Sequence, residues 1–216
     1  MTKPVSRRWE GGGETFGWKG VWFTMTSGPQ QSIPSESVME HPFLGLSPRQ
    51  RHRRFWPALG LAVIAAVVLQ VVDRPLKTDA APQGIVSFEL AGSPAQMALI
   101  LRSWDAKARL HAAFSLGFDY LFMLAYASAL ALAALWAGEG AGGWMGRLGV
   151  GMAWAMGVAG LADAAENGLL WRALLGTAPE SYPFWARGAA MLKFAVIGIV
   201  LLYVFVASVM RWIRHR

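Results

Sequence analysis

Four ionisable residues interrupt long apolar stretches of this chain, and their types are the ones that could do chemistry. Asp119, Asp163, Glu166 and Lys193 each stand inside a run of hydrophobic side chains. A charged group in hydrocarbon costs roughly 2.5–3.5 kcal/mol even on the mildest scales, and it usually faces a protein interior or a wet cavity. These residues therefore mark the place where we expect a functional site.

The spacing of three polar residues predicts that they share one helix face. Asp163, Glu166 and Asn167 stand at positions i, i+3 and i+4, which are neighbours on the surface of a helix. In steps of four the same face continues through small residues, which let helices approach closely in lipid: Ala159, Ala155 and Gly151. We expect the polar group to point into a bundle. The small-residue face is also a candidate contact for a homo- or hetero-oligomer.

Asp119 and Tyr126 are predicted to share a face of another helix, about two turns apart. Lys193 supplies a single cation for the three acids. Desolvation and repulsion between like charges oppose ionisation of all three, so we expect one acid to be protonated, or the cavity to hold water or a cation. The alternative is an ion-pair network with Asn167 and Tyr126 that only fixes helix register.

The elements that must position these residues are four expected membrane spans. Of the 216 residues 55% are hydrophobic and 15% are charged, whereas a soluble domain carries about 25% charged residues. Each expected span meets or approaches the roughly 20 residues needed to cross hydrocarbon, and the spans cover residues 55–72, 112–137, 148–170 and 189–210. The fold class predicted is an all-α polytopic membrane protein, an antiparallel four-transmembrane-helix bundle over residues 55–210.

Because the four spans alternate in direction, the ionisable residues are predicted to lie at one depth. The second and fourth spans begin on the outer side, and the third ends there. At a rise of 1.5 Å per residue the four residues lie roughly 9–13 Å from the outer ends of their helices. The prediction is therefore one polar site in the outer half of the membrane.

Basic residues flank the first and last spans on the side that holds both termini: Arg51, Arg53, Arg54, Arg211, Arg214 and Arg216. The positive-inside rule assigns this side, including the basic tail 211–216, to the cytoplasm. The same flanks account for much of the net charge of +7. The expected partner is thus the lipid bilayer, and no nucleic acid is expected.

Residues 73–111 are the one sizeable segment expected outside the membrane, on the extracytoplasmic side. Ser93 and Pro94 predict a helix start, with the serine as N-cap and the proline at the first helical position. An apolar face follows at helical spacing, made of Met97, Ile100, Leu101 and Trp104. This indicates an amphipathic helix that either rests on the membrane surface or caps a cavity in the bundle.

Residues 1–54 differ in character from the rest of the chain. They contain Gly11-Gly12-Gly13, scattered Pro and Ser, and no apolar periodicity, a composition that favours disorder. We expect a disordered cytoplasmic tail. A mis-assigned upstream start is the open alternative, since Met25 or Met39 would also begin a membrane protein of this kind.

Several segments resemble a group of small, uncharacterised bacterial membrane proteins with four spans. The likeness rests on Phe88 to Ser93 (FELAGS), Phe118 to Tyr120 (FDY) and Ala159 to Asn167 (AGLADAAEN), and covers roughly residues 55–210. The resemblance implies a bacterial inner membrane and the four-span plan. It implies no substrate, cofactor or reaction, so no residue's role is carried over from it.

Three functions remain open for the polar pocket, whose candidate binding residues are Asp119, Tyr126, Asp163, Glu166, Asn167 and Lys193. The first is binding or conducting a small cation, a proton or a small molecule. The second is an enzyme acting on a lipid or isoprenoid, with acids as general acid and base. The third is a structural subunit of a membrane complex. No cofactor or metal is indicated, because the chain has no cysteine and its four histidines lie outside the expected spans.

Overall fold

The computed structural model describes residues 15–18, 21–24, 41–139, 143–177 and 179–214, and the chain divides into two compact units, 1–39 and 40–216. In the first unit, β1 (Thr15–Trp18) pairs antiparallel with β2 (Val21–Thr24), with Thr15 opposite Thr24. The rest of residues 1–40, on which the prediction of a disordered tail also falls, lies outside the described residues.

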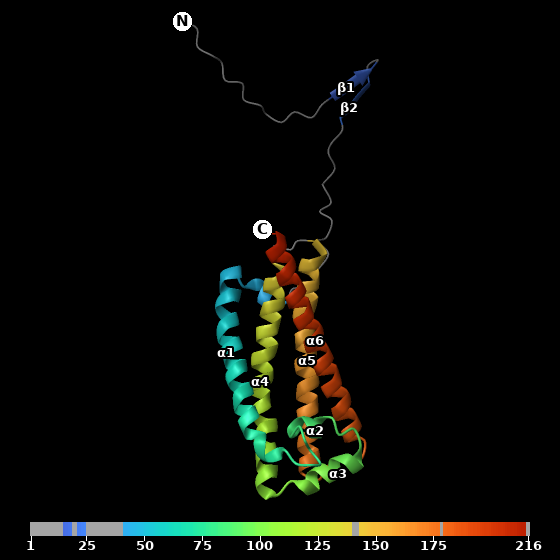
Figure 1. Ribbon diagram of the computed structural model, residues 1–216. Coiled ribbons are helices and arrows are strands. Elements are labelled where there is room, and N and C mark those ends of the chain that lie inside the picture. The colour runs from blue at the N-terminus through green and yellow to red at the C-terminus, as the bar shows by residue number, and fades with distance from the viewer. Residues whose placement is uncertain (1–14, 19–20, 25–40, 140–142, 178, 215–216) are drawn as a thin grey trace. The chain divides into compact units, whose positions relative to one another are not determined.

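The second unit is helical. Figure 1 shows the long helices side by side and the short helices α2 and α3 across one end. The elements in chain order are η1 (Pro42–Gly45), α1 (Pro48–Val72), η2 (Arg74–Leu76), α2 (Ile85–Glu89), α3 (Pro94–Ser103), α4 (Ala106–Gly138), α5 (Gly143–Leu174) and α6 (Tyr182–Arg214). Four of them, α1, α4, α5 and α6, are long and apolar enough to cross a membrane. The predicted all-α four-helix bundle is confirmed.

The long helices extend beyond the predicted spans because polar turns continue them past the apolar windows. Helix α1 begins at Pro48, before the predicted start of the first span at residue 55, behind a capping box. Ser47 Oγ accepts from the Gln50 backbone N–H, and the Ser47 N–H donates to Gln50 Oε1. Before this cap, the His41 ring lies edge-on to Trp154 of α5, with centroids 5.1 Å apart. Within the predicted tail, the described residues 41–54 thus form η1 and the first turns of α1.

Helix α4 is the central element of the bundle. It packs extensively against α1, α5 and α6, while α1 makes no comparable contact with α5 or α6 in the described part of the chain. The α4–α5 contact is close at Gly149, where a Cβ would come within 2.8 Å of the Ala134 carbonyl oxygen and of the Tyr203 hydroxyl. Three helices therefore form a tight group, and α1 lies along one side of it.

The small-residue row on α5 does not follow the bundle interior as predicted. Ala159 is fully buried, Ala155 is half-buried and Gly151 is exposed, with open space where its Cβ would be. Four residues turn a helix by about 40° more than one full turn, so steps of four drift around it. The buried row instead runs through Met156 and Ala153. The oligomer contact through Gly151 and Ala155 stays a prediction, while Ala159 is already enclosed by its own bundle.

Residues 73–105 fold back over the end of the bundle and form a cap with its own core. Ser93 caps α3 as predicted, accepting from the Gln96 N–H, with Pro94 in the first turn. The apolar face of α3 is buried at Met97, Ile100 and Trp104. These side chains pack in one cluster with Phe88 and with residues of the long helices. The structure therefore favours the capping interpretation of this helix over a helix resting on lipid.

Candidate functional site

A buried lysine joins two carboxylates at the centre of the polar site. Lys193 Nζ of α6 lies 2.8 Å from Asp163 Oδ1 and 2.8 Å from Glu166 Oε2, both on α5. The carboxylate side chains are at most 1% exposed and that of Lys193 is 7% exposed. Asp163 and Glu166 stand one turn apart, so a single ammonium from the neighbouring helix reaches both.

Helix α4 contributes a phenol and a third carboxylate to the same place. Tyr126 donates from its hydroxyl to Asp163 Oδ2 at 2.7 Å, and the Asn167 side-chain amide donates to Asp119 Oδ2 at 2.6 Å. Asp119 is half-buried, whereas Tyr126 and Asn167 are buried. The structure thus brings together all six residues that the sequence singled out, and the contacts agree with a common level along the bundle for the four ionisable residues among them. Their role in binding stays a prediction.

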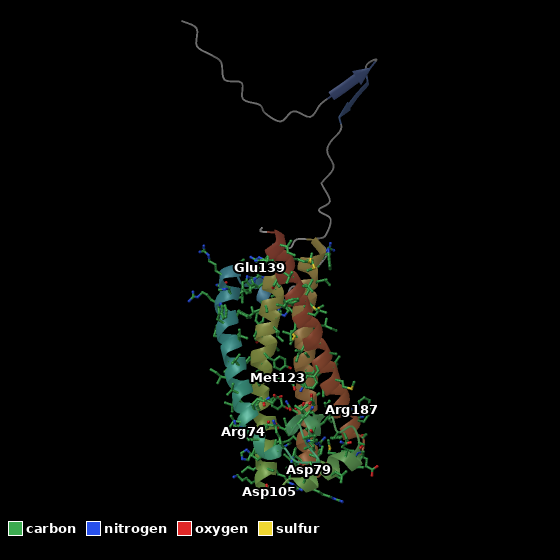
Figure 2. All side chains as sticks on the ribbon, in the orientation of Figure 1. Arg74, Asp79, Asp105, Met123, Glu139 and Arg187 are labelled. Carbon is green, nitrogen blue, oxygen red and sulfur yellow. The ribbon has the colours of Figure 1, made fainter. Side chains whose placement is uncertain are left out.

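Figure 2 locates the level of this site along the bundle. It labels Met123 of α4 between Glu139 at one end of the helix and Asp105 near the other. Asp119 precedes Met123 by one turn, toward the end that the cap covers. The site therefore belongs to the half of the bundle beneath α2 and α3.

Sequence reasoning missed one member of the site, Glu89 at the end of α2. Its carboxylate is buried, and Oε2 lies 3.8 Å from Lys193 Nζ. The omission arose because residues 73–111 were expected to lie outside the membrane, where an acid carries no special signal. The signal available was local: Glu89 follows Ile85, Val86 and Phe88, and an acid at the end of such an apolar run is unlike a solvated loop residue.

Glu89 stands in an environment that disfavours its charged form. Burial, opposed by the Lys193 ammonium and reinforced by the neighbouring Glu166 carboxylate, raises the pKa of Glu89 to about 8. Among the described residues, the buried Glu166 Oε1 has no hydrogen-bond partner. A protonated Glu89 beside it would provide the donor that Glu166 needs, so the pair has the chemistry to hold a proton between two carboxylates.

The site opens into a pocket of about 590 Å³ bounded by α1, α2, α4 and α6. Asp119, Tyr126, Asp163, Lys193 and Glu89 line it, and so do apolar side chains from the long helices. The apolar lining comprises Ala66 and Leu69 of α1, Phe122 and Leu130 of α4, and Phe194 and Ile197 of α6. A mostly apolar concavity with a few convergent polar groups is the usual form of a small-molecule site.

Hydrogen bonds and one turn in the segment between α1 and α4 hold Glu89 at this pocket. Asp73, the C-cap of α1, accepts from the Ile85 N–H at 2.7 Å and so ties the start of α2 to the end of α1. Gly84 between them has φ +62°, which favours glycine. The Trp104 indole N–H donates to the Leu76 carbonyl at 2.9 Å in the buried core of the cap. These bonds fix α2 and hence Glu89.

The acids are not arranged around a vacant centre for a metal ion. Within the described residues, no three His, Cys, Asp or Glu side chains are grouped so as to hold one. Lys193 Nζ occupies the point between Asp163 and Glu166 where a cation would gain most from both charges. The arrangement thus suits hydrogen bonding and proton exchange better than the coordination of a hard metal ion, which takes six or more oxygens.

Comparisons of the chain with models of protein families, with curated proteins and with solved structures give no match. The fold and the site geometry are therefore the basis for the function proposed below.

Proposed function

We propose that this membrane protein binds a small molecule in the pocket beside Lys193. The observation that carries the proposal is the pocket itself, a mostly apolar concavity at whose wall Glu89, Asp119, Tyr126, Asp163 and Lys193 converge. Ionisable residues buried within membrane helices are expensive and by default mark a functional site. Here they lie beside a cavity of about 590 Å³, which has room for a ligand.

The count of charges supports a ligand-binding role over a purely structural network. Lys193 neutralises one carboxylate, yet Glu89, Asp163 and Glu166 all lie within 4 Å of its ammonium. Asp119 adds a fourth acid, held only by the Asn167 amide within the described residues. A structural network would be expected to balance its charges, because each unpaired buried charge is destabilising. Protons or a ligand that donates hydrogen bonds would satisfy the excess.

Binding is favoured over conduction through the protein. On the side of the site away from the cap, the interior between α4, α5 and α6 is filled by an apolar cluster that includes Ala134, Ala153, Met156 and Val200. A conducting path needs polar or wet positions along its length, and the described residues of this cluster offer few. The pocket therefore serves as a one-sided site, suited to a receptor, a carrier subunit or a sensor.

An enzyme acting on a lipid or isoprenoid is the second candidate, and a specific observation favours it. The acids differ in environment: Glu89 is held toward its protonated form, while Asp163 receives hydrogen bonds from Lys193 and Tyr126. Pairs of acids in unequal environments are what general acid–base catalysis uses. Comparing the lipids of a deletion strain and its parent tests this candidate, and unchanged lipids would contradict it. A structural role in a membrane complex remains the third hypothesis.

We propose that the protein lies in the plasma membrane of a bacterium, as the resemblance implies, and that both termini are in the cytoplasm. The support is the basic flank at the end where α1 begins and α6 ends, which includes Arg49, Arg53, Arg54 and Arg211. In this orientation the cap formed by α2 and α3 lies on the extracytoplasmic side.

Analysis of compounds that co-purify with the protein tests the binding proposal. Wild type, Asp119→Asn and Asp79→Asn are purified in equal amounts from the same membranes, and their extracts are compared by mass spectrometry. Asp79 is an exposed acid outside the pocket and provides the matched control. We expect at least one compound enriched with wild type and Asp79→Asn and depleted about ten-fold with Asp119→Asn. Identical extracts from all three would contradict the proposal.

A further inference from the structure

The pocket has an open side between two spanning helices. Its walls come from Ala66 and Leu69 of α1 and from Phe194 and Ile197 of α6, with α4 as the floor. Helices α1 and α6 make no extensive contact with each other in the described residues, and both pack on α4. In a membrane, the space between two such helices faces lipid. The site is therefore accessible sideways from the bilayer.

Polarity changes along the length of the pocket. Near the cap it is lined by Asp73, Lys77, Gln83 and Glu89, and toward the middle of the bundle by Leu130 and Ile197. At 1.5 Å per residue, Asp119 and Leu130 of α4 are separated by roughly 16 Å along the helix. A molecule lying in this pocket would place its polar end beneath the cap and its apolar end toward the membrane centre. This is the orientation of a lipid in the same leaflet.

The hydrogen-bonding groups select the polar end of the ligand. The donors at the centre of the site are already committed: Tyr126 and Lys193 to Asp163, and Asn167 to Asp119. What remains in the lining near this centre are acceptors, namely the second oxygen of Asp119 and the Glu89 carboxyl. Lys77, the other cation of the lining, is paired with Asp73 at 3.9 Å. Asp119 and Glu89 therefore favour a donor such as an ammonium over a phosphate or carboxylate, which would meet like charge.

We propose that the ligand is an amphiphile with a primary amine headgroup and no phosphate, which reaches the pocket from the membrane between α1 and α6. Its ammonium lies against Asp119 and Glu89, and its hydrocarbon chain lies along Phe122, Leu130 and Ile197. This inference rests on the proposed binding function and adds the chemical class of the ligand and its route.

Equilibrium binding of labelled dodecylamine to the full chain in phosphatidylcholine nanodiscs tests the inference, with empty nanodiscs giving the background of partitioning. We expect saturable binding above that background, weakened about ten-fold by Asp119→Asn and by Glu89→Gln, since each removes a charge-assisted hydrogen bond to the ammonium. The controls Asp79→Asn and Glu180→Gln change exposed acids outside the pocket. Both should bind as wild type does.

Access between the helices is tested by filling the open side. Ala66→Phe narrows the pocket from α1, while Ile64→Phe enlarges a lipid-facing residue of the same helix that is outside the pocket lining. We expect at least a ten-fold loss of dodecylamine binding with the first and none with the second. Equal dodecylamine binding by both variants would contradict the position of the ligand's hydrocarbon chain between α1 and α6.

Two further probes separate the inference from the proposed function. Propylamine bound as tightly as dodecylamine would show a site for soluble amines, and dodecyl phosphate bound more tightly would show the wrong headgroup. Either result overturns the inference, while the proposed function stands if binding still depends on Asp119. The inference is also overturned if none of the probes shows binding that Asp119→Asn weakens. In that case the co-purification experiment decides the proposed function independently.

Discussion

Lys193 connects residues that the chain separates widely. Its ammonium lies within 4 Å of Glu89, Asp163 and Glu166, which belong to two other helices. The cation attracts three acids that would otherwise repel one another, and the low exposure of the group makes each of these interactions stronger than in water. The residue is therefore central to the stability of the site as well as to its charge.

We predict that Lys193→Met destabilises the protein by about 3–5 kcal/mol, because it leaves buried carboxylates without their cation. The measurement is thermal unfolding in detergent, with Lys107→Met on the exposed surface of α4 as the control. The triple variant Lys193→Met, Asp163→Asn, Glu166→Gln should regain most of the loss by removing the unpaired charge. Unfolding of the single variant at the wild-type temperature would show that the ion pair contributes nothing.

Because of Glu89, we predict that the free energy of unfolding decreases as the pH rises. Its folded-state pKa of about 8 lies above the ordinary 4.5, so between these values the folded protein holds a proton that the unfolded chain has lost. This contribution is fully present below pH 4.5 and is lost as the pH rises through 8, with a slope of at most about 1.4 kcal/mol per pH unit. The groups facing Glu89 are Lys193, Glu166 and Asp163.

The measurement is the free energy of unfolding of wild type and Glu89→Gln at a series of pH values from 5 to 9. Glutamine cannot lose a proton, so the difference between the two proteins should change across this range. The exposed Glu180→Gln should parallel wild type. Parallel curves for wild type and Glu89→Gln would mean that Glu89 does not titrate in this window.

At the scale of elements, the short helix α2 depends on one turn. Gly84 precedes α2 with φ +62°, and a Cβ there would overlap the Asp73 carboxylate. That carboxylate accepts from the Ile85 N–H and holds the start of α2. The turn therefore sets where Glu89 lies above the pocket.

We predict that Gly84→Ala destabilises the protein by about 1–3 kcal/mol, through backbone strain and displacement of Asp73. It should also weaken dodecylamine binding, because Glu89 moves with α2. Gly60→Ala is the matched control, since Gly60 lies within α1 and has open space where a Cβ would be. The readouts are the unfolding temperature and the binding isotherm. An unchanged unfolding temperature for Gly84→Ala would contradict the role assigned to this turn.

At the scale of the whole molecule, the orientation in the membrane can be tested cleanly because the natural chain has no cysteine. We predict that Asp79→Cys, in the segment leading to the cap, reacts with a membrane-impermeant maleimide on intact cells. Arg147→Cys, near the start of α5, should react only after lysis. Both positions are exposed, so a difference in labelling reports the side of the membrane. The opposite pattern would reverse the orientation and place the cap in the cytoplasm.

Hydropathy and helical spacing were enough to predict much of this protein from its sequence. The four spans follow from long apolar runs, because a helix is the structure that satisfies its backbone hydrogen bonds in lipid. The shared face of Asp163, Glu166 and Asn167 follows from 3.6 residues per turn. Their common level with Asp119 and Lys193 follows from alternation of the spans, and the contacts between these side chains agree with it.

Only the tertiary structure decided which groups touch and where the pocket lies. Glu89 joins the site because the cap folds back onto the bundle. Local sequence patterns do not predict this long-range contact. The drift of the row from Ala159 to Gly151 around α5 follows from the pitch of the helix, but which part of that row is buried depends on how α5 packs against α4. The open side follows from α1 packing on α4 without closing onto α6. The sequence alone determined which residues are unfavourable in lipid, because the free energy of placing a charged residue in the membrane depends only on that residue and its span. Pairing and access depend on distances between helices, which arise only when the bundle packs.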